Sequence, residues 1–321
     1  MPGFPAPPPD PVLVALLRAA GCVFAEDEAR LIEETAGSPA QAAELAARRA
    51  DGLPLELVLG WAEFCGLRIA VTPGVFIPRR RTEFLARQAI ALGGRAGGPH
   101  VVLDLCCGSG AIGLAILNGL RTPGPAAGAG GTEASETGTV SAGGTEVSGN
   151  GTGGNGTGGM VGASGTGTGR LSVELHAADV DPAAVACARA NIGAAGRVSQ
   201  GDLYDALPAS LRGRVTLLTA NVPYVPTAEI ALLPPEARDH EPPATLDGGA
   251  DGLGLLRRVT SGAPSWLAPG GWLLIETSDR QLALAVQAVA AAGLRGGSMH
   301  DPELGATIVA GTWPASPASR A

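Results

Sequence analysis

The stretch His100-Val-Val-Leu-Asp-Leu-Cys-Cys-Gly-Ser-Gly110 decides the fold, because it joins an apolar strand-like run to a glycine-rich turn. Strand-like and helix-like runs alternate from here on, at residues 101–105, 111–120, 171–179, 182–192, 215–220, 253–267, 272–276 and 282–292. Such alternation predicts an α/β domain with a doubly wound parallel sheet. Two last runs, at 294–299 and 306–313, predict a terminal antiparallel hairpin. The ligand is expected at the carboxyl ends of the strands.

Residues 1–60 precede this pattern and carry apolar side chains at helical spacing, such as Val12 and Leu16. They predict a small helical domain. A linking β-hairpin is expected at 61–76, where glycine and proline punctuate short runs. The second domain is expected to occupy 77–321.

Residues 121–170 interrupt the second domain. Glycine and threonine recur there without a fixed period, and large apolar side chains are nearly absent. Such a segment buries too little apolar surface to order itself, so it predicts a disordered insertion without a catalytic role.

The composition narrows the class of protein. The chain has 321 residues, no lysine and a net charge of −8, which disfavours nucleic acid as a partner. It shows no signal peptide, no long apolar run and no C-x-x-C pair, so we expect a cytoplasmic protein with reduced thiols and no membrane contact. No metal site is expected. The four histidines, which lack metal-ligand spacing and are expected at the surface or in loops, are His100, His176, His240 and His300.

The glycine-rich turn after Asp104 predicts an adenosyl cofactor. Its residues Gly108-Ser-Gly-Ala-Ile-Gly113 also match the G-x-G-x-x-G pattern of dinucleotide-binding folds, which is the competing interpretation. In those folds the first glycine directly follows the strand, whereas here an acidic residue and three others intervene. Asp104 is therefore expected to meet a cationic amino-acid tail, which S-adenosylmethionine has and NAD lacks.

Two further acidic residues follow later strands. Asp179 can accept hydrogen bonds from both ribose hydroxyls, and its alternative is a helix N-cap. Because Asp181 directly precedes Pro182, Asp181 is the better cap by position, which leaves Asp179 for the ligand. Asp202 can accept from an adenine amino group or stabilise a turn.

Asn221-Val-Pro-Tyr224 follows the apolar run 214–220 and suits a planar NH2 group. The Asn221 side-chain oxygen and the Val222 main-chain oxygen can accept the two amide hydrogens, and Tyr224 can stack on the amide plane. A glutamine amide nitrogen is a poor nucleophile, so positioning supplies most of the catalysis. The tetrapeptide therefore indicates an amide or amino methyltransferase.

Other motifs occur in a fixed order along the chain: Leu53-Pro-Leu-Glu-Leu-Val-Leu-Gly60, Glu63-Phe-Cys-Gly66, Val75-Phe-Ile-Pro-Arg79, Gly201-Asp-Leu203 and Glu241-Pro242. With Asp104 to Gly110, Asp179 and Asn221 to Tyr224, they make nearly the whole chain similar to the HemK/PrmC protein-(glutamine-N5) methyltransferases. Several motifs in one order are more specific than any single motif.

This resemblance implies a seven-stranded class I S-adenosylmethionine-dependent methyltransferase domain, which is Rossmann-like, and an N-terminal domain that helps to recognise a protein substrate. The implied acceptor is the Gly-Gly-Gln glutamine of class 1 peptide chain release factors. The resemblance places the cofactor turn on Cys106, Cys107, Gly108, Ser109 and Gly110, the ribose carboxylate on Asp179, the adenine contacts on Asp202 and Leu203, and the acceptor-binding residues on Asn221, Val222, Pro223 and Tyr224. Asn221 is also expected beside the cofactor.

The sequence departs from the family pattern at three places. Val222 replaces the first of two prolines, which predicts reduced rigidity with the carbonyl acceptor kept. Cys106 and Cys107 replace the first glycine and a small residue of the turn, which is harmless only if Cys106 does not need a positive φ. Arg80 and Arg81 replace Pro-Glu, so residues 79–81 either contact an acidic partner or face solvent, and we expect solvent.

Two other functions compete with glutamine methylation. An adenine-N6 methyltransferase acting on nucleic acid would present the same NH2 geometry to Asn221. A cofactor-binding protein without catalysis is suggested by Val222 and Cys106 together.

Overall fold

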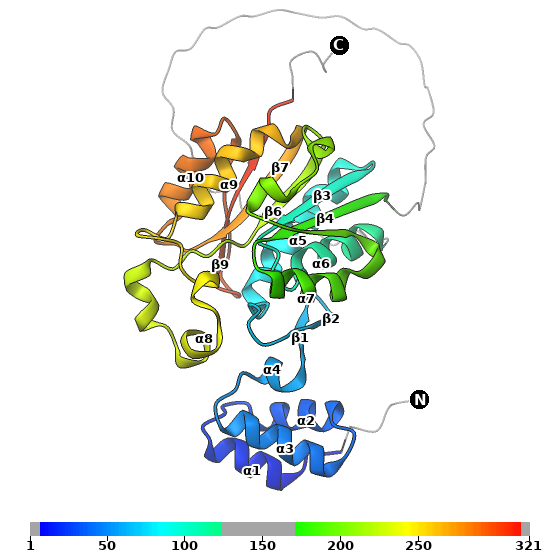
Figure 1. Ribbon diagram of the computed structural model, residues 1–321, viewed down its shortest axis with the longest axis vertical. Coiled ribbons are helices and arrows are strands. Elements are labelled where there is room, and N and C mark those ends of the chain that lie inside the picture. The colour runs from blue at the N-terminus through cyan, green and yellow to red at the C-terminus, as the bar shows by residue number, and fades with distance from the viewer. Residues whose placement is uncertain (1–6, 123–170, 316–321) are drawn as a thin grey trace, which may run out of the picture.

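The apolar runs that follow residue 100 form one seven-stranded sheet with the order β5-β4-β3-β6-β7-β9-β8. The computed structural model describes residues 7–122 and 171–315 (Figure 1). The strands are β3 His100–Leu105, β4 Val173–Asp179, β5 Arg197–Gln200, β6 Val215–Ala220, β7 Leu267–Thr277, β8 Arg295–Asp301 and β9 Ala306–Thr312. Strands β3 to β7 pair in parallel, while β9 is antiparallel to β7 and β8. The expected α/β class and the expected terminal hairpin are confirmed.

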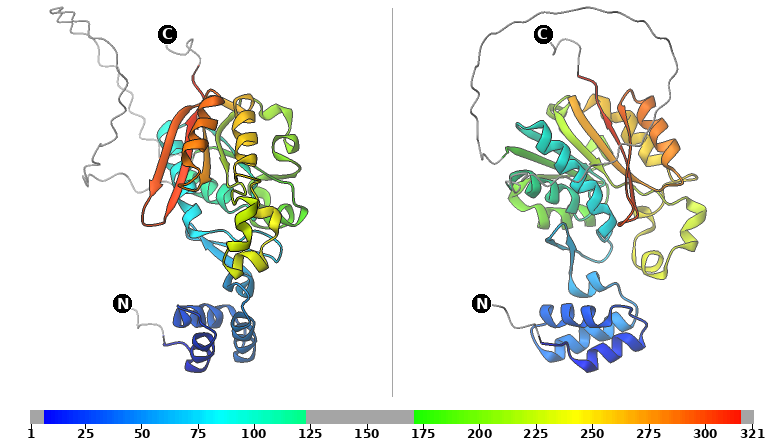
Figure 2. Two further views of the ribbon diagram at one scale, coloured as in Figure 1. Left: turned by 90° about the vertical axis from the view of Figure 1, so that its left-hand side faces the viewer. Right: turned by 180° about the vertical axis from the view of Figure 1, so that it is seen from behind.

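Helices cover both faces of the sheet (Figures 1 and 2). They are α5 Glu83–Ala96, α6 Ala111–Arg121, α7 Pro182–Ile192, α9 Gly254–Gly262 and α10 Leu282–Ala291. The short helix α8 Pro235–His240 lies in the loop that follows β6, away from the sheet (Figure 1). Val102 belongs to the core under α5, α6 and α7, whereas its neighbour Leu103 belongs to the core under α9 and α10. Because successive strand residues point to opposite faces, an almost continuous apolar strand is needed for two buried faces.

The helix expected at 253–267 ends earlier than predicted, since α9 stops at Gly262. Pro264 follows in a short 3-10 turn, and a proline has no N–H to continue the helical hydrogen bonding. Strand β7 then begins at Leu267, which makes it longer than the expected 272–276.

Four helices form a separate cluster at the N-terminal end: α1 Pro11–Ala19, α2 Ala25–Thr35, α3 Pro39–Ala50 and α4 Leu55–Leu59. Leu17, Ile32 and Ala46 are completely buried at its centre. Figures 1 and 2 show this cluster at one end of the molecule, away from the sheet and joined to it through α4 and a hairpin. No helix in the described part of the chain combines the length and the apolarity that a membrane crossing requires.

The hairpin consists of β1 Trp61–Phe64 and β2 Leu67–Ala70. Cys65 and Gly66 form its two-residue turn with φ values of 50° and 73°, and two positive values are typical of a type I′ turn. Asn191 of α7 exchanges hydrogen bonds of 2.8 and 2.9 Å with the main chain of Ala70. The same Asn191 side chain donates to the carbonyl of Ser109 at 2.9 Å, so the hairpin is tied to the glycine-rich turn.

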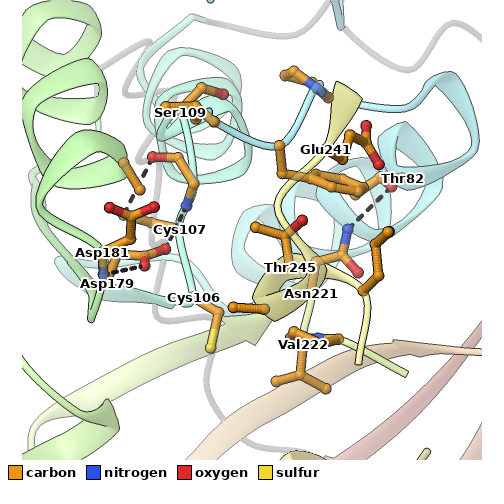
Figure 3. A pocket seen from close by; sticks show the side chains of 18 of the residues that line it. Thr82, Cys106, Cys107, Ser109, Asp179, Asp181, Asn221, Val222, Glu241 and Thr245 are labelled. Carbon is orange, nitrogen blue, oxygen red and sulfur yellow. Dashed lines mark hydrogen bonds between the residues drawn. The ribbon is translucent and has the colours of Figure 1, made fainter. Parts of the chain in front are cut away.

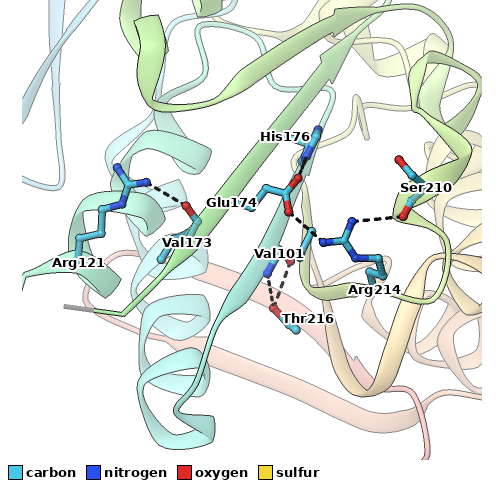
Figure 4. Close-up of polar contacts among 8 residues, drawn as sticks. All are labelled: Val101, Arg121, Val173, Glu174, His176, Ser210, Arg214 and Thr216. Atoms are coloured by element: carbon cyan, nitrogen blue, oxygen red, sulfur yellow. Dashed lines mark hydrogen bonds and ion pairs between the residues drawn. The ribbon is translucent and has the colours of Figure 1, made fainter. Parts of the chain in front are cut away.

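Two of the histidines correct the expectation of a surface or loop position. His100 and His176 lie in β3 and β4 and are each 3% exposed. The His176 ring contacts the Glu174 carboxylate at 2.9 Å, and Arg214 contacts the same carboxylate at 3.1 Å (Figure 4). A polar partner two residues away on the same strand therefore allows the His176 ring to be buried, and His100 contacts the Thr216 hydroxyl of the neighbouring strand β6 at 3.2 Å.

The expected insertion at 121–170 lies outside the described residues except for its first two, 121 and 122. Arg121 belongs to α6 as its last residue, so the helix extends one position into the expected insertion.

Candidate active site

One cavity of about 670 Å³ collects the motifs that follow different strands. It lies at the carboxyl ends of β3, β4, β5 and β6, where a doubly wound sheet binds its ligands. The predicted site residues that line it are Cys106, Cys107, Gly108, Ser109, Asp179, Asp202, Leu203, Asn221, Val222, Pro223 and Tyr224. Figure 3 shows the turn and Asp179 on one side of this cavity and Asn221 with Thr82 on the other.

The glycine-rich turn presents open backbone to the cavity. Gly108 has a φ of 54°, and a Cβ atom placed on it would meet no atom within 4 Å. Gly110 has a φ of 78° and begins α6; a Cβ there would lie 2.9 Å from Ile192 and 3.2 Å from Ala188. Gly108 thus leaves room for a ligand, whereas Gly110 lets α6 pack closely on α7.

Asp104 corrects one expectation, because it does not line the cavity. Its side chain is completely buried. The carboxylate accepts hydrogen bonds from the Gly113 N–H at 2.9 Å and from the Thr219 hydroxyl at 3.1 Å. Burial raises the pKa of Asp104 to about 7. The carboxyl group supports the turn from below and is not placed to meet the cationic tail of a ligand.

Asp179 lines the cavity and is itself held by the turn. Its two carboxylate oxygens accept from the N–H groups of Gly108 at 2.9 Å and Asp181 at 3.0 Å. Each oxygen keeps a second lone pair, which can accept a ligand hydroxyl. Asp181 caps α7 by accepting from the Ala183 N–H at 2.8 Å, so the two aspartates divide the roles as their positions suggested.

Asp202 and Leu203 form the edge of the cavity after β5. The Asp202 carboxylate contacts the Arg258 guanidinium at 2.8 Å, and both side chains are about half exposed. Leu203 has a positive φ of 49° and is 8% exposed, so it presents its backbone and an apolar side chain to the cavity. Asp202 therefore has a protein partner that the sequence did not reveal.

Asn221 has a defined side-chain orientation. Its Nδ2 group donates to the Thr82 hydroxyl at 3.4 Å, and Thr82 is 2% exposed (Figure 3). The amide nitrogen is thus turned to Thr82, and Oδ1 is left as an acceptor. Val222 is 1% exposed, and within residues 7–122 and 171–315 its carbonyl accepts no hydrogen bond. Asn221 and Val222 both line this end of the cavity, and among the described residues neither Oδ1 of Asn221 nor the Val222 carbonyl is engaged by a hydrogen-bond donor.

Known proteins are similar in sequence to most of this chain. The release factor glutamine methyltransferase of Geobacter sulfurreducens is 35% identical over 235 residues, which cover 72% of this chain and 63% of that protein. The one of Bordetella pertussis is 34% identical over 256 residues, which cover 78% and 74%. The chain belongs to the release factor glutamine methyltransferase family. The resemblance to HemK/PrmC enzymes, which use S-adenosylmethionine, is thereby confirmed.

Two further facts describe this similarity. A 4-amino-L-phenylalanine/4-methylamino-L-phenylalanine methyltransferase of Streptomyces pristinaespiralis is 32% identical over 241 residues, covering 74% of this chain and 65% of that protein. The chain thus spans less than two thirds of the Geobacter and S. pristinaespiralis proteins. No protein-family model matches the chain.

The residues at the turn fit the S-adenosylmethionine of the family. This side of the cavity suits an adenosine group that carries no phosphate. Gly108 leaves the backbone open, Asp179 keeps lone pairs for the ribose hydroxyls, and Leu203 is apolar. A pyrophosphate would instead bring two negative charges against Asp179, which disfavours a dinucleotide.

Cys106 carries the family turn at a cost. The φ of Cys106 is 53°, which is a left-handed conformation that favours glycine. Cysteine adopts this conformation only with backbone strain. Burial raises the pKa of the Cys106 thiol to about 12 and the pKa of the Cys107 thiol well above its ordinary value. Both thiols are therefore protonated and unreactive at neutral pH.

Arg80 and Arg81 are exposed, as expected for this loop, but Arg79 and Arg81 also contact buried carboxylates. Arg79 pairs with Glu241, and Arg81 pairs with Glu276 at 3.1 Å. The carboxylate side chains are 1% and 3% exposed, so each arginine neutralises a buried charge. The partners in both pairs are more than 100 residues apart in the sequence, so no local pattern indicates them.

Sequence reasoning also missed the support of the acceptor tetrapeptide. The loop at 247–252 approaches it so closely that a Cβ on Gly248 would lie 2.7 Å from the Pro223 oxygen. Gln281 donates to the loop and to Tyr224. The run Asp247-Gly-Gly-Ala-Asp-Gly252 is a turn signal, but nothing in it indicates the partner.

Proposed function

We propose that the chain transfers a methyl group to the side-chain amide nitrogen of a glutamine in a protein, with the Gly-Gly-Gln glutamine of a class 1 release factor as the acceptor. The single observation that supports this most is the orientation of Asn221 by Thr82 at 3.4 Å, which leaves a side-chain oxygen as an acceptor in the residue before Val222, whose carbonyl accepts no hydrogen bond within the described part of the chain. Family membership supports the same substrate class.

The two acceptors perform complementary tasks. A primary amide offers two N–H donors in one plane, and Oδ1 of Asn221 with the carbonyl of Val222 can accept one each. These contacts fix the amide plane and draw electron density toward the nitrogen. Because positive charge develops on that nitrogen as it reacts, carbonyl dipoles stabilise the transition state more than the ground state.

Pro223 and Tyr224 shape the same end of the cavity. Val222 precedes a proline, so its backbone is restricted to the extended region even without the family's first proline. The Tyr224 ring is half-buried and lines the cavity, where it can stack on a planar amide. The geometry of the acceptor group is therefore set by three consecutive residues.

Cys106 to Ser109, Asp179, Asp202 and Leu203 would hold S-adenosylmethionine. The chemistry that this cofactor supplies when bound is an electrophilic methyl group on a sulfonium, so a new N–C bond forms as the C–S bond breaks. The Asn221 and Val222 oxygens hold the amide hydrogens, one of which leaves as a proton to restore a neutral amide. No acid or base with a shifted pKa is needed at the nitrogen.

The test is methyl transfer from labelled cofactor to three acceptors: a release factor, its variant with the Gly-Gly-Gln glutamine replaced, and DNA. Mass spectrometry of the release factor should locate one added methyl group on the glutamine. Label in the DNA would favour the adenine alternative, and no label with cofactor bound would favour the non-catalytic one.

Asn221→Ala should abolish turnover, because the amide loses one of its two acceptors. Affinity for S-adenosylhomocysteine, measured by calorimetry, should change less than about threefold. Persistent turnover in this variant would contradict the role given to Asn221.

The S. pristinaespiralis relative raises a second candidate, a small arylamine acceptor. An aniline NH2 group is also planar and offers two N–H donors to the same carbonyls. The same assay with 4-amino-L-phenylalanine distinguishes the two, because a release-factor enzyme should transfer no label to the free amino acid.

Residues 1–60 would recognise the protein substrate, and the reaction would take place in the cytoplasm. The position of α1 to α4 at one end of the molecule, joined through the hairpin, supports a separate recognition unit (Figure 1). Comparing kcat/KM for a whole release factor with that for a short Gly-Gly-Gln peptide tests it, because only the whole protein can reach both units.

A further inference from the structure

A second cavity of about 290 Å³ lies directly behind the acceptor end of the main one. It is lined by residues 276–280 at the end of β7 and 305–307 at the start of β9. Arg81 and Tyr224 line both cavities, so their contact forms part of the wall between them. The Tyr224 ring therefore has free space beside it, and something must prevent it from turning into that space.

Arg81 makes two kinds of contact with Tyr224. Its Nη2 group donates to the Tyr224 hydroxyl oxygen, and its guanidinium carbon lies 5.7 Å from the centre of the ring. An arginine over an aromatic face is attracted by the ring quadrupole. A single side chain thus holds both the tip and the face of the ring.

Arg81 is itself anchored by a buried carboxylate. Its Nε group donates to Oε1 of Glu276 at 3.1 Å, and the Glu276 side chain is 3% exposed, whereas that of Arg81 is 47% exposed. A buried carboxylate without its cation is costly, so Glu276 favours the conformation in which Arg81 stays in the wall. Burial raises the pKa of Glu276, and Arg81 opposes that rise.

The sheet brings this anchor next to the acceptor residues. Ala220 of β6 pairs with Ile275 of β7, so the residues that follow them, Asn221 and Glu276, lie side by side at the strand ends. Arg81 and Thr82 are consecutive in the 3-10 turn Arg80–Thr82. One turn therefore contacts Asn221 through Thr82 and Tyr224 through Arg81, at opposite ends of the tetrapeptide.

We propose that Arg81 is a positioning residue that fixes the Tyr224 ring against the acceptor group, with Glu276 as its buried anchor. This inference rests on the proposed function. The contact between Arg81 and Tyr224 is a property of this chain, since the family resemblance places a glutamate at position 81. A glutamate there could neither donate to Tyr224 nor pair with Glu276.

The test uses the full chain with tyrosine labelled at Cζ with carbon-13, whose shift reports the hydrogen bonding of the phenolic oxygen. The chain has two tyrosines, and Tyr204 donates instead to the Val259 carbonyl at 2.6 Å. Arg81→Met should move the Tyr224 signal and leave the Tyr204 signal in place. Tyr224→Phe assigns the two signals.

The same variant should lower kcat for a release factor by roughly 10- to 100-fold, the penalty expected for a misplaced reacting group. Its affinity for S-adenosylhomocysteine should stay within about twofold. Arg81→Lys keeps the charge but lacks the planar fork that reaches two partners, so it should recover only part of kcat. Arg80→Met is the matched control, because Arg80 is an exposed neighbour with the same charge and should have no effect.

An unmoved Tyr224 signal in Arg81→Met would overturn the positioning role, and so would an equal loss of kcat in Arg80→Met. A parallel loss of cofactor affinity would also overturn it, because the effect would then not be confined to the acceptor end. Failure of the unaltered protein to methylate a release factor would instead overturn the proposed function, while the carbon-13 signals would still report the contact between Arg81 and Tyr224.

Discussion

Gln281 donates a hydrogen bond of 2.8 Å from its Nε2 group to the main-chain oxygen of Tyr224. The same group donates to the Asp251 oxygen at 2.9 Å, and Oε1 accepts from the Ser278 hydroxyl at 2.7 Å. Gln281 is the residue immediately before α10 and is 7% exposed. One buried amide therefore connects the acceptor tetrapeptide, the 247–252 loop and the start of a helix.

Gln281→Leu should lower both stability and turnover. Two partly buried carbonyl oxygens lose their donor, which costs on the order of 1 kcal/mol each. Because the tetrapeptide is no longer held, kcat should fall by about tenfold or more in the label-transfer assay. Urea titration measures the change in unfolding free energy. Gln287→Leu, on the exposed side of α10, should change neither.

Gly252→Ala should disrupt the acceptor end. Gly252 has a φ of 73°, and a Cβ there would lie 2.2 Å from both the Tyr224 oxygen and Gln281 Nε2. The loop must move away, so turnover should fall by at least tenfold. Gly249→Ala is the control. An alanine at its φ of 89° adds about 1–2 kcal/mol of backbone strain, but the added Cβ would meet no atom within 4 Å. Equal kinetic losses in the two variants would contradict a specific role for Gly252.

Asp179→Ala should weaken binding of S-adenosylhomocysteine by at least about tenfold, because the ribose loses a charged acceptor. Calorimetry measures this directly. Asp181→Ala should instead keep the affinity and lower the unfolding free energy by about 1 kcal/mol, the usual value of an N-cap. Unchanged affinity in Asp179→Ala would limit that residue to holding Gly108.

Cys106→Gly should stabilise the folded protein slightly. Removing the side chain relieves about 1–2 kcal/mol of left-handed strain, and the freer unfolded chain takes back roughly 0.5–1 kcal/mol. We expect a net gain of up to about 1 kcal/mol in thermal or urea unfolding. A loss of stability would show that packing of the Cys106 thiol outweighs the strain at its φ of 53°.

Asp104→Asn should change how stability depends on pH. The pKa of Asp104 is raised from 3.8 to about 7, so between these values the folded state keeps a proton that the unfolded state has released. Stability of the unaltered protein therefore contains a term that falls as pH rises through this window, by on the order of 1.4 kcal/mol per unit at most, and then levels off. Asparagine can still accept from Gly113 and does not titrate.

The stability difference between Asp104→Asn and the unaltered protein should thus grow in favour of the variant from about pH 4 to about pH 7. Urea titrations at several pH values measure it, and the subtraction removes the effect of other carboxyl groups. A difference that stays constant across this range would show that Asp104 is ionised in the folded protein throughout.

Much of the fold was predictable because local signals agree with the final structure. The apolar run at 101–105 and the turn that follows it indicate a strand before a helix, and Asp181-Pro182 marks the start of α7. These features depend on neighbouring residues only. The number of strands, by contrast, came from the family resemblance, and their order became known only from the structure.

The parts that were wrong or missed depend on partners distant in sequence. Asp104 was expected to face the ligand, but whether a side chain after a strand points into the core is decided by the neighbouring strand that carries Thr219. Arg81 is exposed as expected, but its contact with Glu276 at the end of β7 was missed, because nothing near Arg81 in the sequence indicates that partner. Such pairs form only once the sheet has brought the strand ends together.

Arg121 donates from Nη2 to the Val173 carbonyl at 2.9 Å, joining the end of α6 to the start of β4 (Figure 4). Val173 pairs with His100 at the opposite end of the strands from the cavity. The chain therefore leaves the described part after residue 122 and returns at 171 on the side of the sheet remote from the chemistry. A fluorescent reporter or an immobilisation tag attached at the exposed Thr122 would therefore sit at the end of the sheet remote from the cavity, which offers a practical handle for single-molecule binding measurements.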